Sequence, residues 1–357
     1  MGVAGFVPVT DWGLFPEGDR PFVVAGPCSA ESRQQVLEAA SALRDAGVGV
    51  FRAGIWKPRT HPGGFEGVGH DGLAWLADAH RQTGMKICTE VGSADHVRAC
   101  LDAGVDMLWI GARTTANPFQ VQEICDALRG SNLPVLVKNP VSPDLDLWIG
   151  AVERLMDAGI GKIGVVLRGF TTLDKTPYRN APVWEMSTRI RTRLKDVPLF
   201  VDPSHMAGAV TYIKELSQRA LDLGACGLMI EVHPNPEKAL SDARQQLSPS
   251  QFAALKASLR VRTNTSSDGE YLRSMEELRS SIDDIDSRLL SLLEERMRVS
   301  RSIGALKKEH GISILQTGRW ESVMEALRKD AESIGLDKKM VEEIFSVIHD
   351  YSVKAQE

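Results

Sequence analysis

The sequence predicts an α/β fold, a (β/α)8 TIM barrel, followed by a small all-α domain of three helices. Eight short β-rich runs alternate with helical stretches in the first part of the chain. A polar stretch without apolar periodicity then covers residues 263–269, and only helical patterns follow Tyr271. An open doubly wound sheet would contain similar β-α units, but the count of eight favours a closed barrel.

The elements of the barrel follow one another along the chain. Each expected strand is a short apolar run, and these runs are residues 22–26, 49–53, 86–91, 107–112, 135–138, 163–167, 199–201 and 227–230. Helical spacing fills the segments between them, as at residues 32–46, 93–103 and 207–223. We therefore divide the chain into a barrel domain (residues 1–262), a linker (263–270) and a helical domain (271–357).

The composition indicates a globular protein that does not bind nucleic acid. The 357 residues exceed one ordinary core, and a net charge of −5 does not provide the basic surface that nucleic acid requires. No apolar run is long enough to span a bilayer, and residues 1–20 lack the pattern of a signal peptide, so we expect a cytoplasmic protein without a membrane partner. Five cysteines without a CxxC pair fit a reducing compartment.

The loop after the second expected strand is the most informative part of the chain. Arg52, Lys57 and Arg59 crowd the exit of an apolar run, and Pro58 with two following glycines prevents a helix from continuing there. A loop that gathers cations in this way is suited to holding anions.

Polar side chains also follow the other expected strands. Active sites of barrels lie at the carboxyl ends of the strands, where the following loops begin. In strand order, the polar residues at these ends are Cys28, then Arg52 and Lys57, then Glu90, Arg113, Lys138 and Arg168, then Asp202 and His205, and finally Glu231 and His233. One polar strand end would mean little, but all eight together predict one site.

Five cations in this set would surround one mouth: Arg52, Lys57, Arg113, Lys138 and Arg168. Any one of them could form an ordinary surface ion pair. As a group they favour an anionic guest, since cations crowded at one mouth need a counter-charge. Phosphate and carboxylate groups fit, because guanidinium groups bind both through paired hydrogen bonds.

A second subset has the chemistry of a metal site. Cys28, His205 and Glu231 stand at strand ends, and Asp242 follows eleven residues after Glu231. A thiolate, an imidazole and carboxylates suit a divalent transition metal. Taken alone, Cys28 would more often be a small buried thiol, but its place beside the others reverses that interpretation. The other four cysteines lie within strand or helix patterns and are interpreted as packing residues.

Seven ordered motifs resemble 3-deoxy-D-arabino-heptulosonate 7-phosphate (DAHP) synthase of the short-barrel, type I beta-like kind, over residues 7–262. They are Gly26-Pro27-Cys28-Ser29, Lys57-Pro58-Arg59-Thr60, Gly111-Ala112-Arg113-Thr114, Lys138-Asn139, Leu167-Arg168-Gly169, Asp202-Pro203-Ser204-His205 and Ile230-Glu231-Val232-His233. The resemblance implies condensation of phosphoenolpyruvate with erythrose 4-phosphate, on the route to chorismate, without an added N-terminal regulatory domain.

The resemblance also implies residue roles. Arg52, Lys57, Arg113, Lys138 and Arg168 would bind phosphoenolpyruvate, while Arg59, Thr60 and Asp202 would contact erythrose 4-phosphate. Cys28, His205, Glu231 and Asp242 would hold one divalent transition metal ion per barrel, for which we expect manganese, with iron, cobalt and zinc as alternatives. Lys57 and Glu90 are the candidates for placing the water that adds during the reaction.

The nearest rival reaction in this fold makes the related octulosonate phosphate from arabinose 5-phosphate. That family carries a Lys-Ala-Asn-Arg-Ser type of segment where this chain has Lys57-Pro58-Arg59-Thr60. The proline variant favours the four-carbon sugar.

The C-terminal domain begins with a long helix that predicts a partner subunit. Its apolar positions from Leu278 keep a four-three spacing and include Ile282, Ile285, Leu289, Leu292, Val299, Ile303 and Leu306. A helix over residues 278–308 would be about 46 Å long, more than a small domain can cover. A second copy of the chain is therefore expected to pack against it.

Polar residues interrupt this apolar seam and the face of the last helix. Arg296 takes a seam position, and Lys307, eleven residues later, lies on the same face. Arg296 could instead turn its head out of the stripe into solvent. Ser352 and Gln356 are one turn apart near the end of the chain. Arg279 lies seventeen residues before Arg296 and points elsewhere, so it could serve only a partner's pocket.

This pattern resembles the all-helical chorismate mutase, an intertwined dimer of three-helix chains, over residues 271–357. By that resemblance Arg279 would come from the partner, Arg296 and Arg319 would hold the substrate carboxylates, and Lys307 and Gln356 would donate to the ether oxygen, with Ser352 also at the site. Conversion of chorismate to prephenate is a rearrangement that needs no cofactor. Catalysis would come from holding one conformer and stabilising negative charge.

Two departures leave an alternative open for this domain. Gln316 stands where the family usually has an aspartate, and Trp320 stands where it usually has a glutamate. The domain could therefore be a regulatory module that binds chorismate or prephenate without catalysis. Lys307 and Gln356 favour the enzyme, because a pure sensor has little reason to keep donors for a breaking bond. Prephenate bound here is also expected to inhibit the barrel.

Overall fold

The computed structural model describes residues 5–57, 63–173, 175–262, 267–314 and 317–356. The chain divides into two compact units, Met1–Asn264 and Thr265–Glu357. Within the described residues, no helix combines the length and the apolar character needed to cross a membrane.

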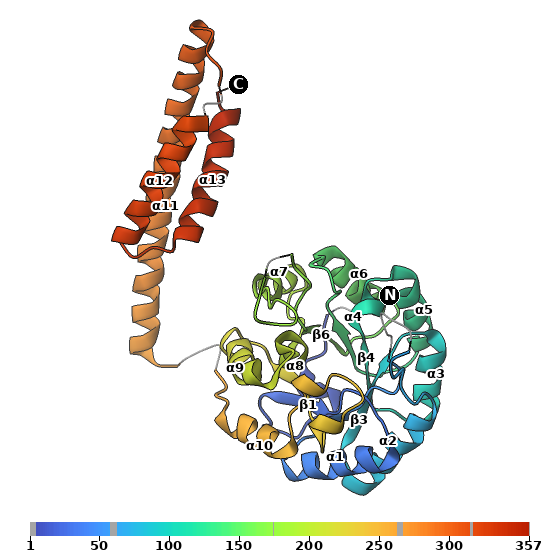
Figure 1. Ribbon diagram of the computed structural model, residues 1–357. Coiled ribbons are helices and arrows are strands. Elements are labelled where there is room, and N and C mark those ends of the chain that lie inside the picture. Colours follow the sequence, from blue (N-terminus) through green and yellow to red (C-terminus); the bar gives the residue numbers. More distant parts are fainter. Residues whose placement is uncertain (1–4, 58–62, 174, 263–266, 315–316, 357) are drawn as a thin grey trace. The chain divides into compact units, whose positions relative to one another are not determined.

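The first unit is a closed barrel of eight parallel strands, which Figure 1 shows ringed by helices. Each strand pairs with its neighbour in sequence, and β1 also pairs with β8 to close the sheet. The strands are β1 (Phe22–Gly26), β2 (Val50–Arg52), β3 (Lys86–Val91), β4 (Met107–Ile110), β5 (Val135–Lys138), β6 (Ile163–Leu167), β7 (Leu199–Val201) and β8 (Gly227–Glu231). The predicted barrel is confirmed.

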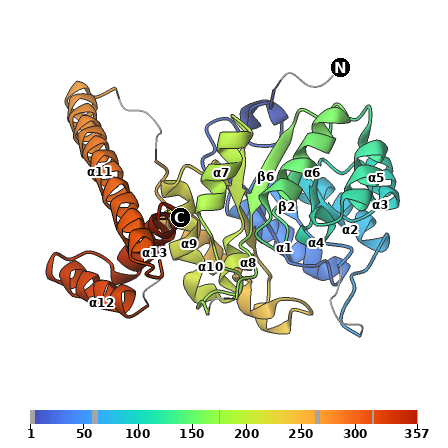
Figure 2. The same ribbon diagram turned by 90° about the horizontal axis from the view of Figure 1, so that it is seen from above.

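Helices cover the outside of the barrel, as the second view in Figure 2 also shows. They are α1 (Arg33–Asp45), α2 (Asp71–Thr83), α3 (Ala94–Asp102), α5 (Pro118–Leu128), α6 (Leu145–Asp157), α7 (Glu185–Arg193), α9 (Ile213–Asp222) and α10 (Pro249–Ser258), with short α4 (Ala112–Thr115) and α8 (Pro203–Ala207) at strand ends. Ser, Asn or Asp side chains cap α1, α3, α5, α6, α8 and α10 by accepting backbone N–H groups.

Two apolar layers hold the barrel together. One lies between the strands and the helices, and the other fills the barrel interior. The N-terminal segment contributes Trp12 to the inner layer, where its ring stacks on Phe200 at 6.2 Å. The interior is therefore a packed core rather than a channel.

Several element boundaries differ from the sequence-based prediction, and three of these differences have a clear local cause. The fourth strand ends at Ile110 rather than at residue 112, because Gly111 caps the short helix α4. The helix expected over residues 207–223 is broken at Gly208, whose left-handed conformation ends α8, so that α9 begins only at Ile213. The long C-terminal helix begins at Gly269, since Asp268 accepts hydrogen bonds from the first backbone N–H groups.

The second unit contains the three predicted helices, α11 (Gly269–Glu309), α12 (Thr317–Ser333) and α13 (Lys338–Lys354). Figure 1 shows α12 and α13 lying along α11, while the first turns of α11 extend beyond both. The apolar seam of α11 is exposed along its length, from 42% at Ile303 to 61% at Leu278. One chain alone therefore leaves this seam uncovered.

Candidate active sites

Four side chains, three near the carboxyl ends of β1, β7 and β8 and one on the loop after β8, converge on one point. Cys28 Sγ and carboxylate oxygens of Glu231 and Asp242 all lie within 4.8 Å of one another. His205 Nε2 lies 3.7 Å from Glu231 Oε1 and 4.0 Å from Asp242 Oδ2. Glu231 is fully buried, and its Oε1 accepts no hydrogen bond from the described residues. This donor set and its unsatisfied oxygen fit a divalent transition metal.

Asp202 orients the imidazole of His205. Its carboxylate caps α8 by accepting the His205 backbone N–H at 2.9 Å, and its Oδ2 lies 2.7 Å from His205 Nδ1. A proton on Nδ1 leaves the lone pair of Nε2 for a ligand. Burial alone would raise the pKa of Asp202, but His205 and Lys138 hold that pKa well below its usual range. Burial lowers the pKa of His205 despite Asp202 and so favours the neutral ring.

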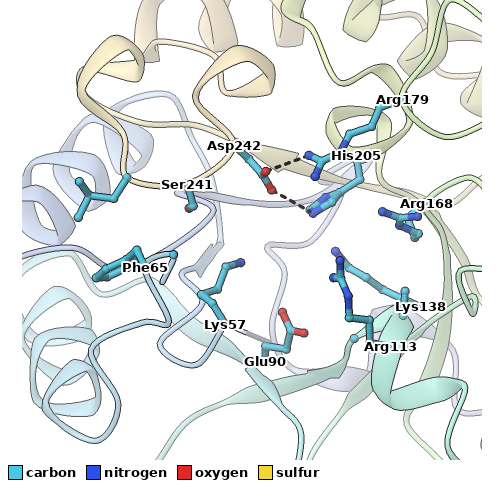
Figure 3. A pocket seen from close by; sticks show the side chains of 14 residues that line it. Lys57, Phe65, Glu90, Arg113, Lys138, Arg168, Arg179, His205, Ser241 and Asp242 are labelled. Carbon is cyan, nitrogen blue, oxygen red and sulfur yellow. Dashed lines mark hydrogen bonds and ion pairs between the residues drawn. The ribbon is translucent and has the colours of Figure 1, made fainter. Parts of the chain in front are cut away.

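The loop after β8 carries Asp242 in a left-handed backbone conformation, with φ of 48°. Arg179 Nη1 donates to Asp242 Oδ1 at 2.9 Å and to Gln245 Oε1 at 2.8 Å. Figure 3 shows Arg179 and His205 reaching Asp242 together. Arg179 was not among the predicted site residues, since it lies on the long loop after β6, away from any strand end.

A glutamine joins this loop to the end of β1. Cys28 N donates to Gln246 Oε1 at 2.9 Å, and Gln246 Nε2 donates to Ser241 O at 2.8 Å. Cys28 Sγ then lies 3.4 Å from Asp242 Oδ2. Burial, followed by the negative charge of Glu231, raises the pKa of Cys28 to about 12. Without a bound cation the thiol therefore keeps its proton.

Arg52 lies beneath the site as a fully buried cation. Its Nη2 is 3.3 Å from Glu231 Oε1 and donates to Cys28 O at 3.2 Å. Its Nε and Nη1 are buried and donate to no acceptor among the described residues. Because a buried donor without an acceptor is unfavourable, these two groups are suited to binding an anionic ligand.

Lys57 and Glu90 face the same side of the site. Lys57 Nζ donates to Cys28 O at 2.9 Å. Burial opposes its charge, but the negative charges of Cys28, once its thiol is deprotonated, and of Glu90 raise the pKa of Lys57, which therefore stays protonated. Figure 3 shows the Glu90 carboxylate near the Lys57 ammonium in the pocket, with Glu90 on β3 and Lys57 on the loop after β2.

Lys138 and Arg168 complete the cationic wall. Lys138 Nζ donates to Asp202 Oδ2 at 2.7 Å. Arg168 is buried and donates to Asn180 Oδ1 at 2.8 Å, and no carboxylate of the described residues lies within ion-pair distance of it. Burial, aided by the positive charges of Arg179 and Arg113, lowers the pKa of Arg168 to about 10. An anion in the cavity would remove this imbalance.

These residues enclose a cavity of about 430 Å³, drawn in Figure 3. Of the predicted residues, Lys57, Glu90, Arg113, Lys138, Arg168, His205 and Asp242 line it. Cys28, Arg52, Asp202 and Glu231 are buried beside these residues and do not line it. Arg59 and Thr60, predicted to contact the sugar phosphate, lie outside the described residues.

A second group of predicted residues meets between α11 and α13. Arg296 Nη1 donates to Ser352 Oγ, and Lys307 Nζ donates to Gln356 Oε1 at 3.1 Å. Gly304 lies between the two cations on α11, and a Cβ there would be 2.6 Å from Gln356 Cα. The absence of a side chain at Gly304 thus lets the end of α13 approach α11 closely.

The remaining mutase candidates do not join this group within one chain. Arg279 and Arg319 are exposed. Arg279 is separated from Arg296 by seventeen residues of α11, or about 25 Å of helix. Trp320 stacks on His349 with ring centroids 4.0 Å apart and so joins α12 to α13. Gln316 lies outside the described residues.

Comparison with protein-family models gives two matches. The DAHP synthetase I family matches residues 13–266, and chorismate mutase type II matches residues 278–357. Phospho-2-dehydro-3-deoxyheptonate aldolase of Thermotoga maritima is 35% identical over 225 residues, which cover 63% of this chain and 64% of that protein. The chain thus spans less than two thirds of that relative's length.

A further relative has a different name, and two similar solved structures are DAHP synthases. The 2-dehydro-3-deoxyphosphooctonate aldolase of Azoarcus sp. is 30% identical over 245 residues, covering 63% of this chain and 84% of that protein. A crystal structure of DAHP synthase from Thermotoga maritima has a TM-score of 0.59 at 32% identity, covering 73% of this chain and 69% of that one. A truncated form of DAHP synthase from Thermotoga maritima has a TM-score of 0.58 at 32% identity, and the match covers 73% of this chain and 87% of that one.

Proposed function

Because the chain belongs to the DAHP synthetase I family and ends in a chorismate mutase type II domain, we propose that it is a bifunctional enzyme of the shikimate pathway. The barrel condenses phosphoenolpyruvate with erythrose 4-phosphate and water to give DAHP and phosphate. The helical domain rearranges chorismate to prephenate. The observation that carries the barrel reaction is the cluster of Cys28, His205, Glu231 and Asp242 beside a cationic cavity.

The four clustered side chains would hold one divalent transition metal ion, with manganese preferred and iron, cobalt or zinc as alternatives. When bound, this ion supplies Lewis-acid activation of the aldehyde oxygen. The chain itself prepares the ligands. Asp202 orients the His205 ring, and Gln246 links the loop after β1, at Cys28, to the loop after β8, at Ser241. Cys28 has to lose its proton before its sulfur can bind the metal.

The cations of the cavity orient phosphoenolpyruvate. Arg113, Lys138 and Arg168 line the cavity with Lys57, and the free donors of Arg52 lie below it. Bidentate binding of phosphate and carboxylate by guanidinium groups fixes the enol carbon in front of the aldehyde carbon. The new carbon–carbon bond forms between these two atoms.

Glu90 and Lys57 then place the water. Its oxygen adds to the cationic carbon that carries the phosphate group, and phosphate leaves with cleavage of the carbon–oxygen bond. The Glu90 carboxylate can take one proton of this water and pass it to the oxygen of the former aldehyde, whose carbon–oxygen double bond opened when the carbon–carbon bond formed. Lys57 can give a proton to the departing phosphate oxygen and regain it from the added hydroxyl as the ketone forms. Both side chains line the cavity, which supports this assignment.

Erythrose 4-phosphate is assigned to Arg59 and Thr60 through the Lys57-Pro58-Arg59-Thr60 motif. Asp202 is the third candidate for the sugar. Its oxygens already accept hydrogen bonds from Lys138 and His205, so a sugar hydroxyl would share one of them. Arabinose 5-phosphate is the competing substrate, because relatives with 30% identity carry the octulosonate name.

For the helical domain, Arg296 and Arg319 are assigned to the substrate carboxylates, with Arg279 supplied by a second copy of the chain. Lys307 and Gln356, which contact each other across α11 and α13, donate to the ether oxygen. Ser352 holds Arg296 in place. No cofactor is needed, since the rearrangement requires only the compact conformer and stabilised negative charge.

Three further properties belong to this proposal. The chain forms a homodimer through the exposed seam of α11, supported by the apolar side chains that one chain leaves uncovered. Prephenate bound at the helical domain inhibits the barrel. The enzyme works in the cytoplasm, in keeping with its five free cysteines.

Assays of the purified full chain test the proposal. Phosphoenolpyruvate is supplied with erythrose 4-phosphate or with arabinose 5-phosphate, and chorismate is supplied separately, each with and without a chelator. We expect turnover with erythrose 4-phosphate that is lost on chelation, and chorismate turnover that is not. Preference for arabinose 5-phosphate would replace the barrel assignment with the octulosonate reaction.

The Arg296→Ala variant separates the two possible roles of the helical domain. It should remove prephenate formation and also the inhibition of the barrel by added prephenate, because both depend on the same pocket. If the wild-type chain binds prephenate but does not convert chorismate, the domain is a regulatory module instead.

A further inference from the structure

One aromatic side chain lies directly beneath two of the cations assigned to phosphoenolpyruvate. Trp109 on β4 is fully buried in the inner layer of the barrel and is among its largest buried side chains. The Arg52 guanidinium carbon lies 4.6 Å from the centre of its ring, and Lys138 Nζ lies 5.8 Å from it. Arg52 comes from β2 and Lys138 from β5, so one ring contacts cations from both sides.

Hydrogen bonding by the indole N–H does not explain the position of Trp109. Its Nε1 is buried and donates to no acceptor among the described residues. The other tryptophans of the core behave differently, since Trp148 donates to Val137 O at 3.0 Å and Trp12 donates to Val7 O at 2.9 Å. Buried indoles usually find such a partner, and leaving the donor unpaired is unfavourable. The face of the ring, rather than its N–H, is therefore the feature that accounts for this position.

Each of the two cations contacts one acidic side chain, and the Trp109 ring gives each of them a further contact. Arg52 contacts Glu231 at 3.3 Å and Lys138 contacts Asp202 at 2.7 Å. These acids also contact His205, so their positions are tied to the metal-binding cluster. A flat aromatic face attracts a cation without competing for the hydrogen-bond donors that a substrate anion requires. It can thus fix the two cations and leave donors such as Arg52 Nε and Nη1 available.

We propose that Trp109 is a positioning residue for phosphoenolpyruvate: its ring holds the Arg52 guanidinium and the Lys138 ammonium at the spacing that the phosphate and carboxylate of the substrate require. Trp109 does not line the cavity, so its ring acts through the two cations rather than on the substrate directly. Its effect is therefore on affinity for phosphoenolpyruvate more than on the chemical step. This inference rests on the proposed function of the barrel.

The test measures phosphoenolpyruvate binding to the full metal-loaded chain by calorimetry, together with KM and kcat. Trp109→Leu keeps the site apolar but removes the ring, and it should raise the Kd and KM for phosphoenolpyruvate by roughly 10- to 30-fold, with a smaller change in kcat. Trp109→Phe retains an aromatic face and should stay within about threefold of the wild type. Trp109→Met gives a second ring-free variant that adapts to the space if the leucine variant does not fold.

Trp148→Phe is the matched control, because it alters a fully buried tryptophan of α6 outside the cavity. It should lower thermal stability without changing the Kd for phosphoenolpyruvate. The inference is overturned if a folded ring-free variant binds phosphoenolpyruvate as the wild type does, or if Trp109→Phe binds as weakly as Trp109→Leu. Failure of the wild-type chain to bind phosphoenolpyruvate would instead overturn the proposed function.

Discussion

At the scale of single residues, the barrel site depends on a glycine as well as on its charged side chains. Gly111 follows β4 and lines the cavity together with Glu90. A Cβ at Gly111 would overlap Glu90 Oε1, so the carboxylate occupies space that only glycine leaves free. The position of Glu90 is thus set from a neighbouring strand.

We predict that Gly111→Ala lowers kcat of the condensation by about 10- to 100-fold, since small displacements of a catalytic group have effects of this size. Thermal stability should change little, because the flexible Glu90 side chain moves instead of the backbone. Gly92→Ala is the control, as its added Cβ would meet only Thr114 Oγ1 at 3.5 Å and His96 Nδ1 at 3.9 Å. Equal kcat in the two variants would contradict the role of Glu90.

Cys28 allows a second test at this scale. Cys28→Ala should reduce bound metal from about one ion per chain to near zero and abolish DAHP formation, because the thiolate is one of the proposed ligands. Chorismate turnover should be unchanged. Cys125→Ala, at a buried cysteine of α5 away from the cavity, should keep both metal and activity. Metal analysis and both assays give the answer, and an active, metal-binding Cys28→Ala would refute the site.

The sequence groups the metal-ligand candidates, but it does not predict which side chains pair with one another. Strand ends of a barrel converge whatever their sequence separation, so Cys28, His205, Glu231 and Asp242 could be grouped from spacing and motif alone. The pairing of Arg52 with Glu231, and of Lys138 with Asp202, depends on side-chain directions inside the barrel. Arg179 lies far along an irregular loop, and only the folded chain brings it to Asp242.

At the scale of elements, apolar periodicity located the strands and helices, while their ends were set by local capping. Gly111, Gly208 and Asp268 each moved a boundary, because a cap overrides the periodic pattern at the last turn. In the helical domain, Gly304 lets α13 meet α11 at the point where Lys307 contacts Gln356.

Gly304→Ala should destabilise the helical domain by about 1–3 kcal/mol, the usual effect of adding a methyl group to a packed contact. It should also lower chorismate turnover, because the Gln356 backbone has to move away from α11. Gly269→Ala on the same helix is the control, since a Cβ there meets nothing within 4 Å. Thermal unfolding followed by circular dichroism would measure the difference, and identical melting of both variants would contradict the close contact.

At the scale of the whole molecule, the exposed seam of α11 supports the proposed homodimer, in which the mutase pocket would use residues of two chains. Ile285 and Leu289 are each about half-exposed, a large loss of favourable burial if nothing covers them. Arg279 lies about 25 Å along the helix from Arg296, so it can reach such a pocket only from another chain.

We predict that the double variant Ile285→Lys with Leu289→Lys dissociates the dimer and abolishes chorismate turnover. Ser287→Lys places a charge on the opposite face of the same helix and should leave a dimer. Analytical ultracentrifugation would determine the mass of each variant. A monomeric wild-type chain with full mutase activity would contradict the proposal.

The buried groups that lack hydrogen-bond partners affect how long the enzyme would survive in a cell. Arg52 Nε and Nη1 and Glu231 Oε1 make the ligand-free barrel less stable than its packing alone would make it. On the proposed function, metal and phosphoenolpyruvate would satisfy these groups and would bind only the folded chain, so they would raise its stability by mass action. Proteases that attack the transiently opened chain would then degrade it faster when either ligand is scarce. The abundance of the enzyme would thus follow the supply of its own substrate, without any dedicated regulator.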